Sequence, residues 1–466
     1  MPLPPSAHTV HVEPELTPNG ILPLGKAIEV LNDLWALMQP VPPEWVTGDT
    51  SKHVANGFGG SAELLPRPCT LYAEVQQAWR KALRWRPDLD DALVAMLAVA
   101  ISTEQVGDQL FLQVIGDAGS AKTRLCEAML VSKTCYPLDH LTGFHSGWKD
   151  ADGKDYSLIS RINRKTLITA EGNTLADSPH YIALMSQSRR IFDGSSGASY
   201  KNRDEDLRYT GLRTPWIMAG TPALMNYDQS RLGDRFLKVW IGQPDEDEKN
   251  AILKRVAFSA MRAVMQKSES DAHTQLSPEL CEASCLTGGY IEYLKNNVCE
   301  LLSQLVFDED EVAERCAKLG EFVAGVRARP SEKKEAMDTK ELPTRLTHQF
   351  VRFACCAAAV LNKKTIDKDV MRRVTKLGLD TCTGVTLKIV KKLYQHTAVQ
   401  TDGVSSDPLY LFVDMSLVDC KAMLRFMKQI ELVDVRQDVE FGIKGKPKWR
   451  LTERMVGLYE SVYGIK

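Results

Sequence analysis

The sequence predicts an α/β fold with a mainly parallel sheet and helices on its faces. Between residues 109 and 245, apolar runs rich in β-branched and aromatic residues alternate with helical patterns, which is typical of parallel strands joined by helices. Residues 246–396 then have a helical pattern, and residues 408–466 have the order helix, helix, hairpin, helix. The expected strands are the runs LFLQVIG, KTLITAEG, TPWIMAG and RFLKVWIG.

These patterns divide the 466 residues into four predicted parts. A proline-rich extension with one helix covers 1–70, an α/β core that begins with two helices covers 71–245, and a helical domain covers 246–396. The tail, 408–466, has the element order of a winged helix-turn-helix. The stretch HTAVQTDGVSSDP before the tail is expected to be a linker.

The composition excludes several classes of function. A net charge of −2 with 25% charged residues is ordinary for a globular protein and excludes a uniformly basic DNA coat, so any nucleic-acid surface must be a local patch. Since no apolar run reaches about 18 residues, no membrane span is expected. The eleven cysteines form no C-x-x-C pair and no disulfide framework, which predicts a reducing, cytoplasmic location.

The segment GDAGSAKT gives the strongest indication of chemistry. It lies between an apolar strand and a helix, and it matches the phosphate loop G-x-x-x-x-G-K-[ST] except that Ala121 replaces the second glycine. Backbone N–H groups of such a loop surround the phosphates, the lysine contacts the β- and γ-phosphates, and the hydroxyl binds Mg²⁺. Ala121 is compatible with this role if its backbone angles stay in an ordinary region. The predicted site for ATP and Mg²⁺ consists of Gly116, Asp117, Ala118, Gly119, Ser120, Ala121, Lys122, Thr123 and Arg124.

This loop resembles that of the minichromosome-maintenance (MCM) helicases, a branch of the AAA+ ATPases that commonly carries alanine before the lysine. The resemblance extends over roughly residues 90–385 and is closer to divergent AAA+ proteins of phages and mobile elements than to cellular MCM helicases. It implies an AAA+ P-loop ATPase core, a helical lid over 246–396 and further residues around the nucleotide.

A P-loop ATPase of this kind needs an acidic residue at the end of a second strand, and Glu171 has that position after Thr166–Thr169. The usual Asp-Glu ending is Ala170-Glu171 here. If Glu171 is the catalytic base, the magnesium partner is missing or is Asn173 or Asp177. If Glu171 binds Mg²⁺ with Thr123, the base is unassigned. This departure predicts slow or weak hydrolysis.

Three further positions match the resembled family. Thr221 follows a strand where that family usually has a polar asparagine sensor. Arg235, with Arg231 as the alternative, matches the arginine finger that reaches the γ-phosphate of a neighbouring subunit, because the guanidinium fork stabilises charge on the transferring group. That role requires an oligomer, either a homohexameric ring or another assembly. Arg345 matches a nucleotide-sensing arginine near the start of a lid helix, on one helical face with His348 and Arg352.

Two insertions and the tail are candidate DNA contacts. The segments TGFHSGWKDADGKDYSLI and GSSGASYKNRDEDLRYTGL are each expected to form a hairpin, and the resembled family projects two hairpins from similar places into a channel. In the tail, LVDCKAMLRFMKQIELV is the expected recognition helix and KGKPKWR a basic wing. The alternatives are solvated surface loops and a protein–protein module. The predicted contacts to DNA phosphates, largely independent of sequence, are Lys149, Lys154, Lys201, Arg203, Lys421, Arg425, Lys428, Lys444, Lys446 and Lys448, with Arg450 also in the wing.

The predicted function is that of an ATP-hydrolysing, helicase-like DNA motor in the replication of a phage or mobile element. One alternative is an AAA+ ATP-dependent switch, such as a loader, a transposition regulator or a defence ATPase. Another is a scaffold that binds nucleotide without turnover. The Ala170-Glu171 ending favours the switch over the motor.

Overall fold

The computed structural model describes the chain from residue 64 to 465 with eleven gaps. These residues belong to the compact unit Val54–Lys466. Residues 1–63 of the predicted extension (1–70) lie outside the described residues. The described ranges are 64–105, 107–146, 156–200, 206–226, 235–265, 277–328, 342–382, 384–397, 403–436, 439–440, 443–444 and 446–465.

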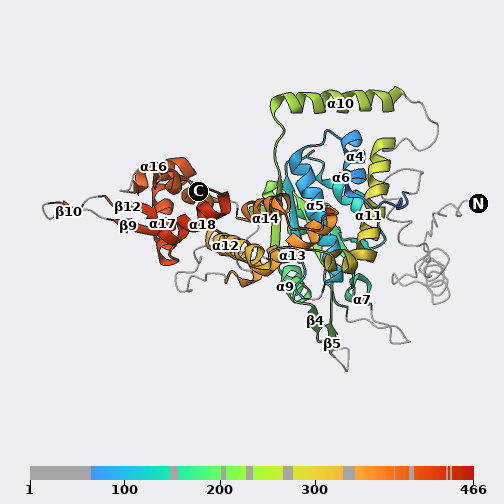
Figure 1. The fold of residues 1–466 in the computed structure, drawn as a ribbon, viewed down its shortest axis with the longest axis horizontal. Helices are drawn as coiled ribbons and strands as arrows, with labels where there is room; N and C mark the ends of the chain where they lie inside the picture. Colours follow the sequence, from blue (N-terminus) through green and yellow to red (C-terminus); the bar gives the residue numbers. More distant parts are fainter. Residues whose placement is uncertain are drawn as a thin grey trace, which may run out of the picture. The chain divides into compact units, whose positions relative to one another are not determined.

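A sheet of five parallel strands lies at the centre of the α/β core (Figure 1). The four apolar runs predicted as strands are confirmed, and a fifth strand at the sheet's edge was not predicted. The strands, in the spatial order β2-β3-β6-β1-β7, are β2 (Cys135–Pro137), β3 (Thr166–Thr169), β6 (Trp216–Gly220), β1 (Phe111–Gly116) and β7 (Phe236–Ile241). Because all five run the same way, their carboxyl ends meet at one edge of the sheet, the carboxyl edge, and their amino ends at the other, the amino edge.

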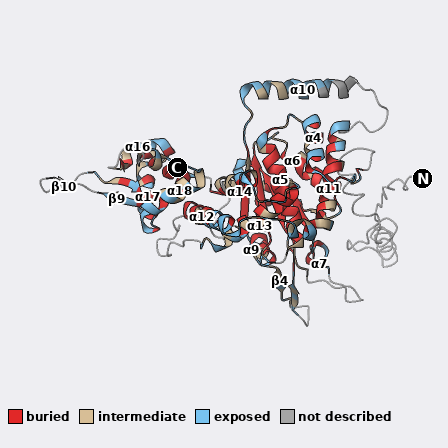
Figure 2. Ribbon diagram, viewed as in Figure 1, coloured by how far each residue is buried: buried red, intermediate tan, exposed pale blue. Residues whose placement is uncertain are grey.

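The two faces of the sheet pack into two apolar cores. Leu112 and Val114 of β1 face one core, whereas Phe111 of the same strand faces the other, as the alternation of strand side chains requires. Every residue of β1 and β6 is buried, which explains why both read as continuous apolar runs. Figure 2 shows buried residues gathered in the interior around α5. The first core contains α4 (Tyr72–Ala82), α5 (Pro87–Ile101) and α6 (Lys122–Met129); the second contains α7 (Ile159–Ile162), α8 (Gly172–Ala176) and α9 (Tyr181–Phe192).

The expected helical part is confirmed, and several of its helices share the first core. α11 (Pro278–Ser303) packs against α4 and α6, α13 (Thr344–Val360) against α5, and α14 (Lys368–Thr381) against β7. A buried ion pair between Arg373 of α14 and Asp90 of α5, with 2.8 Å between the charged atoms, ties the two parts further. The helices are α10 (Glu246–Met265), α11 (Pro278–Ser303), α12 (Glu309–Arg327), α13 (Thr344–Val360), α14 (Lys368–Thr381) and α15 (Val385–Thr397). The predicted boundary at residue 245 stays a prediction.

Helix α10 differs from the other long helices in its exposed apolar side chains. Leu253, Val256, Phe258 and Met261 are each more than half exposed. None of the described helices, α10 included, is both long and apolar enough to cross a membrane.

The tail has the predicted order of helix, helix, hairpin and helix. Its elements are β8 (Val404–Ser405), α16 (Ser406–Val413), α17 (Leu417–Gln429), β9 (Val433–Arg436), β10 (Val439–Glu440), β11 (Ile443–Lys444), β12 (Lys448–Leu451) and α18 (Glu453–Tyr463). Two expectations are wrong in detail. Part of the expected linker is a strand, since β8 pairs antiparallel with β12. The expected recognition helix ends at Gln429 because Glu431 turns the chain with a φ of 62° into β9.

The two strands of one expected insertion hairpin lie within the described residues. β4 (Ser195–Ala198) pairs antiparallel with β5 (Leu207–Thr210), directly after α9 (Figure 1). The tip between them, with Lys201 and Arg203, lies outside the described residues, as does the centre of the other insertion with Lys149 and Lys154. Two short 3-10 helices, η1 (Ser102–Glu104) and η2 (Pro222–Asn226), complete the core.

Candidate functional site

The predicted phosphate loop lies at the carboxyl edge, between β1 and α6. Gly119 has a φ of 80°, and Ala121, the N-cap residue of α6, has a φ of 69°. The expectation that Ala121 has ordinary backbone angles is therefore wrong. Its backbone is in the left-handed region, a conformation that costs an L-residue about 1–2 kcal/mol. The glycine that usually precedes the lysine takes this conformation without a steric penalty.

Lys122 is held over its own loop by oxygen atoms of that loop. Its Nζ donates to the carbonyl oxygens of Gly116 at 2.6 Å and Asp117 at 2.7 Å, and to the hydroxyl of Ser120 at 3.0 Å. The side chain is 7% exposed. Burial lowers the pKa of Lys122, while the nearby carboxylates of Glu171 and Asp117 oppose that shift. The neutral loop oxygens are partners that a phosphate can replace.

The predicted magnesium ligands, Thr123 and Glu171, lie together at the carboxyl edge. The hydroxyl of Thr123, in the first turn of α6, donates to Oε1 of Glu171 at 3.4 Å. Glu171 follows β3 and is exposed. Two oxygens of one octahedral Mg²⁺ at about 2.1 Å lie about 3 Å apart, so this pair fits such an ion with a small adjustment.

Asn173 is bound to the residue predicted as the sensor. Its Oδ1 accepts from the backbone N–H of Thr221 at 2.8 Å, and its Nδ2 donates to the Thr221 hydroxyl oxygen at 3.1 Å. The side-chain amide of Asn173 thus points to the end of β6. If Asn173 bound magnesium instead, its two hydrogen bonds with Thr221 would be lost. Asp177, the other alternative, is exposed at the far end of α8. The link joins residues 48 positions apart in the sequence, so no local pattern predicts it.

Two glycines allow this link. A Cβ atom at Gly172 would lie 2.6 Å from Cγ of Met218 in β6, and one at Gly220 would lie 2.9 Å from Oδ1 of Asn173. Neither position has room for a side chain, so α8 can lie directly against the end of β6. The same close approach places Glu171, which precedes α8, next to Thr123.

Arg235 lies at the amino edge, away from the phosphate loop of its own chain. It precedes β7, and β7 pairs with β1 so that Phe236 is opposite Phe111 and Ile241 is opposite Gly116. Six residues at about 3.3 Å each therefore separate Arg235 from the level of Gly116 by about 20 Å. Within its own chain Arg235 is paired with an acid: Nη2 lies 3.1 Å from Oδ2 of Asp193, and the guanidinium carbon lies 5.3 Å from the centre of the Phe192 ring.

Two more arginines gather at the amino edge. Burial lowers the pKa of Arg189, in the last turn of α9, and the positive charges of Arg235 and Arg345 lower it further. Arg345 is in the first turn of α13, and Gln349 of the same helix donates to the backbone oxygen of Arg235 at 2.9 Å. Sequence reasoning missed Arg189, because no motif marks α9.

The other two residues on the predicted face of α13 lie apart from the phosphate loop as well. Arg352 is close to Gly107, before β1, where an added Cβ would lie 2.8 Å from Nη2. His348 is exposed. Arg231, the alternative finger, lies outside the described residues.

The candidate DNA contacts of the tail are in part exposed and in part paired with acids. Arg425 and Lys428 of α17 are exposed, and Lys421 is half-buried on the same helix. Lys446 Nζ lies 2.6 Å from Oδ2 of Asp407, an ion pair that lowers the pKa of Asp407 and raises that of Lys446. In the wing, Lys444 belongs to β11, Lys448 to β12, and Arg450 lies 4.0 Å from Asp434.

No family model matches this chain, and no curated protein matches it. The function is therefore inferred from the residues and their arrangement.

Proposed function

We propose that this chain is an oligomeric ATPase of the MCM-like AAA+ type that binds and hydrolyses ATP with Mg²⁺ and acts on DNA as a motor. The observation that carries the proposal is the division of the ATPase residues between two edges of one sheet. Lys122, Thr123 and Glu171 lie at the carboxyl edge, whereas Arg235 and Arg345 lie at the amino edge. A phosphate at the loop meets a finger only if a second copy supplies it.

At the carboxyl edge, the loop N–H groups and the N-terminus of α6 would bind the phosphates. Lys122 would exchange the carbonyl oxygens of Gly116 and Asp117 for phosphate oxygens. Thr123 and Glu171 would hold Mg²⁺, which neutralises charge on the β- and γ-phosphates when bound. The Thr221 hydroxyl accepts a hydrogen bond from Asn173, so its own proton is available to orient the attacking water.

The amino edge supports a role in a neighbouring copy. If one subunit presents this edge to the carboxyl edge of the next, each interface holds one complete site, and a head-to-tail contact of this kind forms a ring when the rotation closes. The guanidinium of Arg235 would stabilise charge on the γ-phosphoryl group, at the cost of its contact with Asp193.

DNA is the proposed partner of two surfaces. The β4–β5 hairpin belongs to the insertion with Lys201 and Arg203 near its expected tip. In the tail, Arg425 and Lys428 are exposed on α17, where they would contact phosphates without reading bases. The ion pair of Lys446 with Asp407 competes with such a role for the wing.

A specific observation favours the second candidate, an AAA+ switch that changes its assembly on ATP binding and hydrolyses slowly. Position 170 is alanine, and the amide of Asn173 is bound to Thr221. Glu171 would then have to act either as a ligand of Mg²⁺ or as the base that activates the attacking water. A site with one acid for two tasks binds ATP well and turns it over slowly.

The test compares ATP hydrolysis by the wild type, Lys122→Ala and Lys133→Ala, with and without single-stranded and duplex DNA. Lys133 is an exposed lysine just after α6 and is the matched control. We expect hydrolysis by Lys122→Ala to fall by about 100-fold or more, because the charge that stabilises the transferring phosphoryl group is lost. The control should keep the wild-type rate.

DNA then separates the two candidates. Hydrolysis stimulated by DNA together with strand separation supports the motor. Stimulated hydrolysis without strand separation supports the switch. ATP binding with no hydrolysis in any condition would overturn both and leave a nucleotide-binding scaffold.

A further inference from the structure

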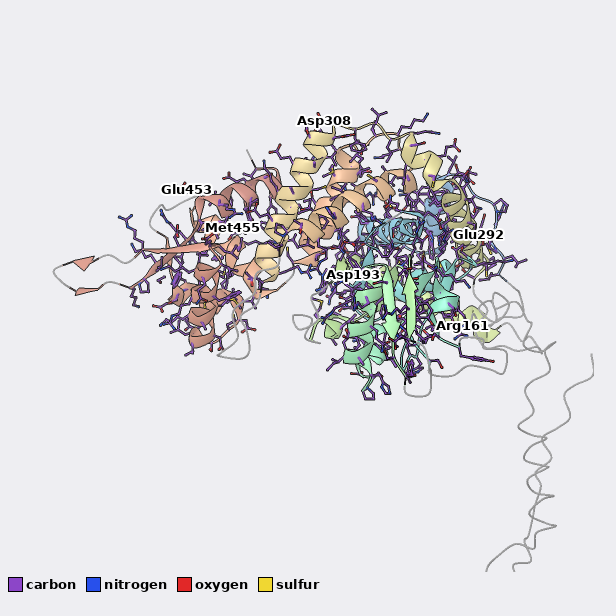
Figure 3. The ribbon with its side chains drawn as sticks, turned by 90° about the horizontal axis from the view of Figure 1, so that it is seen from below. Arg161, Asp193, Glu292, Asp308, Glu453 and Met455 are labelled. Atoms are coloured by element: carbon purple, nitrogen blue, oxygen red, sulfur yellow. The ribbon has the colours of Figure 1, made fainter. Side chains whose placement is uncertain are left out.

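Asp193 connects the proposed finger to its surroundings. Nη2 of Arg235 lies 3.2 Å from Oδ1 and 3.1 Å from Oδ2 of this carboxylate. The side chain of Arg235 is 17% exposed and that of Asp193 is 46% exposed. Asp193 lies at the end of α9 (Figure 3), and the partial exposure of both side chains would let the phosphate of a second copy reach the pair.

The backbone at Asp193 leads directly into the β4–β5 hairpin. Asp193 is the C-cap residue of α9, and its N–H donates to the Arg189 oxygen at 3.1 Å. Gly194, with a φ of 78°, is the only residue between Asp193 and β4. The oxygen of Gly194 accepts from the N–H of Leu212 at 2.9 Å, so both ends of the hairpin meet at this glycine.

The base of the hairpin is itself anchored to the other insertion. The hydroxyl of Ser196 and Nε2 of His145 are 2.9 Å apart, and the rings of His145 and Tyr209 lie 6.0 Å apart. A displacement of Asp193 would therefore act on a small, connected unit rather than on a loose loop.

A phosphate can replace Asp193 as the partner of Arg235. Both groups are charged, which makes their hydrogen bonds strong, but the γ-phosphate of a neighbouring copy carries more negative charge than one carboxylate. When Arg235 turns to that phosphate, Asp193 loses its charged partner. The carboxylate, the end of α9 and the start of β4 must then adjust together, because one glycine joins them.

We infer that Asp193 is a positioning residue that couples the arginine finger to the β4–β5 hairpin of the same chain. Through it, the arrival of nucleotide at a neighbouring subunit changes the hairpin that belongs to the subunit supplying the finger. This inference rests on the proposed function, because it requires Arg235 to act on nucleotide in another copy. Beyond that function, the β4–β5 hairpin is the element that responds to nucleotide, and Asp193 is the residue that transmits the response.

The test measures hydrogen–deuterium exchange of residues 194–212 in the full-length protein, with and without the non-hydrolysable analogue AMP-PNP and Mg²⁺. We expect nucleotide to change the exchange of this segment by about threefold or more in the wild type and in Asp193→Glu, which keeps the charge. In Asp193→Asn the change should disappear, while the affinity for AMP-PNP stays as in the wild type. Asp206→Asn, an exposed carboxylate 3.8 Å from Arg208 beside the same hairpin, is the matched control and should respond like the wild type.

Three results would overturn the inference. The first is an unchanged response in Asp193→Asn, and the second is a hairpin that does not respond in the wild type although Arg235→Ala lowers hydrolysis. A merely structural role would lower the melting temperature of Asp193→Asn and alter exchange in the absence of nucleotide too, which also contradicts it. If the wild type binds AMP-PNP no better than Lys122→Ala does, the proposed function fails first, and the inference falls with it.

Discussion

The two edges of the central sheet differ in the charges that they carry. The carboxyl edge has the predicted phosphate loop, one buried lysine that donates to neutral oxygens, and one exposed carboxylate 3.4 Å from a hydroxyl. The amino edge gathers Arg189, Arg235 and Arg345 near the ion pair with Asp193. The parallel register keeps the edges about 20 Å apart within one chain. Under the proposed function, each chain carries two halves of a phosphate-transfer site that are too far apart to meet within that chain, so the assembly would be part of the site.

Among the substitutions considered, one at the amino edge is expected to have the largest effect on ATP hydrolysis. Arg235→Ala should lower ATP hydrolysis by about 1000-fold, because an arginine finger stabilises charge that develops only in the transition state. In a 1:1 mixture of Arg235→Ala with Lys122→Ala, about a quarter of the interfaces would combine an intact loop with an intact finger, so activity should return. Arg190→Ala, an exposed arginine on α9, is the control. Rescue that fails while both variants fold and assemble would show that the two edges do not complement each other.

The next effect concerns the carboxylate of the carboxyl edge. Glu171→Gln should lower kcat by about 100-fold and leave ATP binding intact, because the amide keeps the shape but cannot accept a proton or hold Mg²⁺ as firmly. Glu127→Gln, which removes the partner of Arg124 on α6, should have little effect. A loss of ATP affinity without a loss of kcat would assign Glu171 to metal binding alone.

A smaller effect is expected at the sensor. Thr221→Val should lower kcat about tenfold with an unchanged KM, because the hydroxyl that orients water is lost while the side chain keeps its shape. The change also leaves Nδ2 of Asn173 without its present acceptor. Thr221→Ser keeps the hydroxyl and should behave like the wild type. Equal loss in both variants would point to packing rather than to the hydroxyl.

The smallest effect is on stability. Ala121→Gly should raise the free energy of unfolding by about 0.5–1 kcal/mol, since relief of the left-handed strain exceeds the added entropy of the unfolded chain. Ala118→Gly is the matched control within the same loop; because Ala118 has no positive φ, this change should lower stability instead. Chemical denaturation measures both, and the same sign for both variants would show that Ala121 is not strained.

The sequence sufficed for the strands and the loop, because fully buried parallel strands leave continuous apolar runs and the loop has its own spacing. It missed β2, which has three residues and ends in a proline, too short for a pattern. Contacts between distant residues also escaped it: Asp193 and Arg235 are 42 positions apart, and Asn173 and Thr221 are 48 apart. The left-handed Ala121 escaped it because local residue type favours the opposite conformation.

Gly172 and Gly220 have a consequence for how this chain tolerates substitution. Neither carries a functional group, yet a methyl group on either would push apart α8 and β6, which hold Glu171, Asn173 and Thr221. A saturation scan scored by activity would therefore mark both glycines as intolerant positions, alongside the charged residues. In such data they would look like members of the catalytic apparatus, although their contribution is the space that they leave empty.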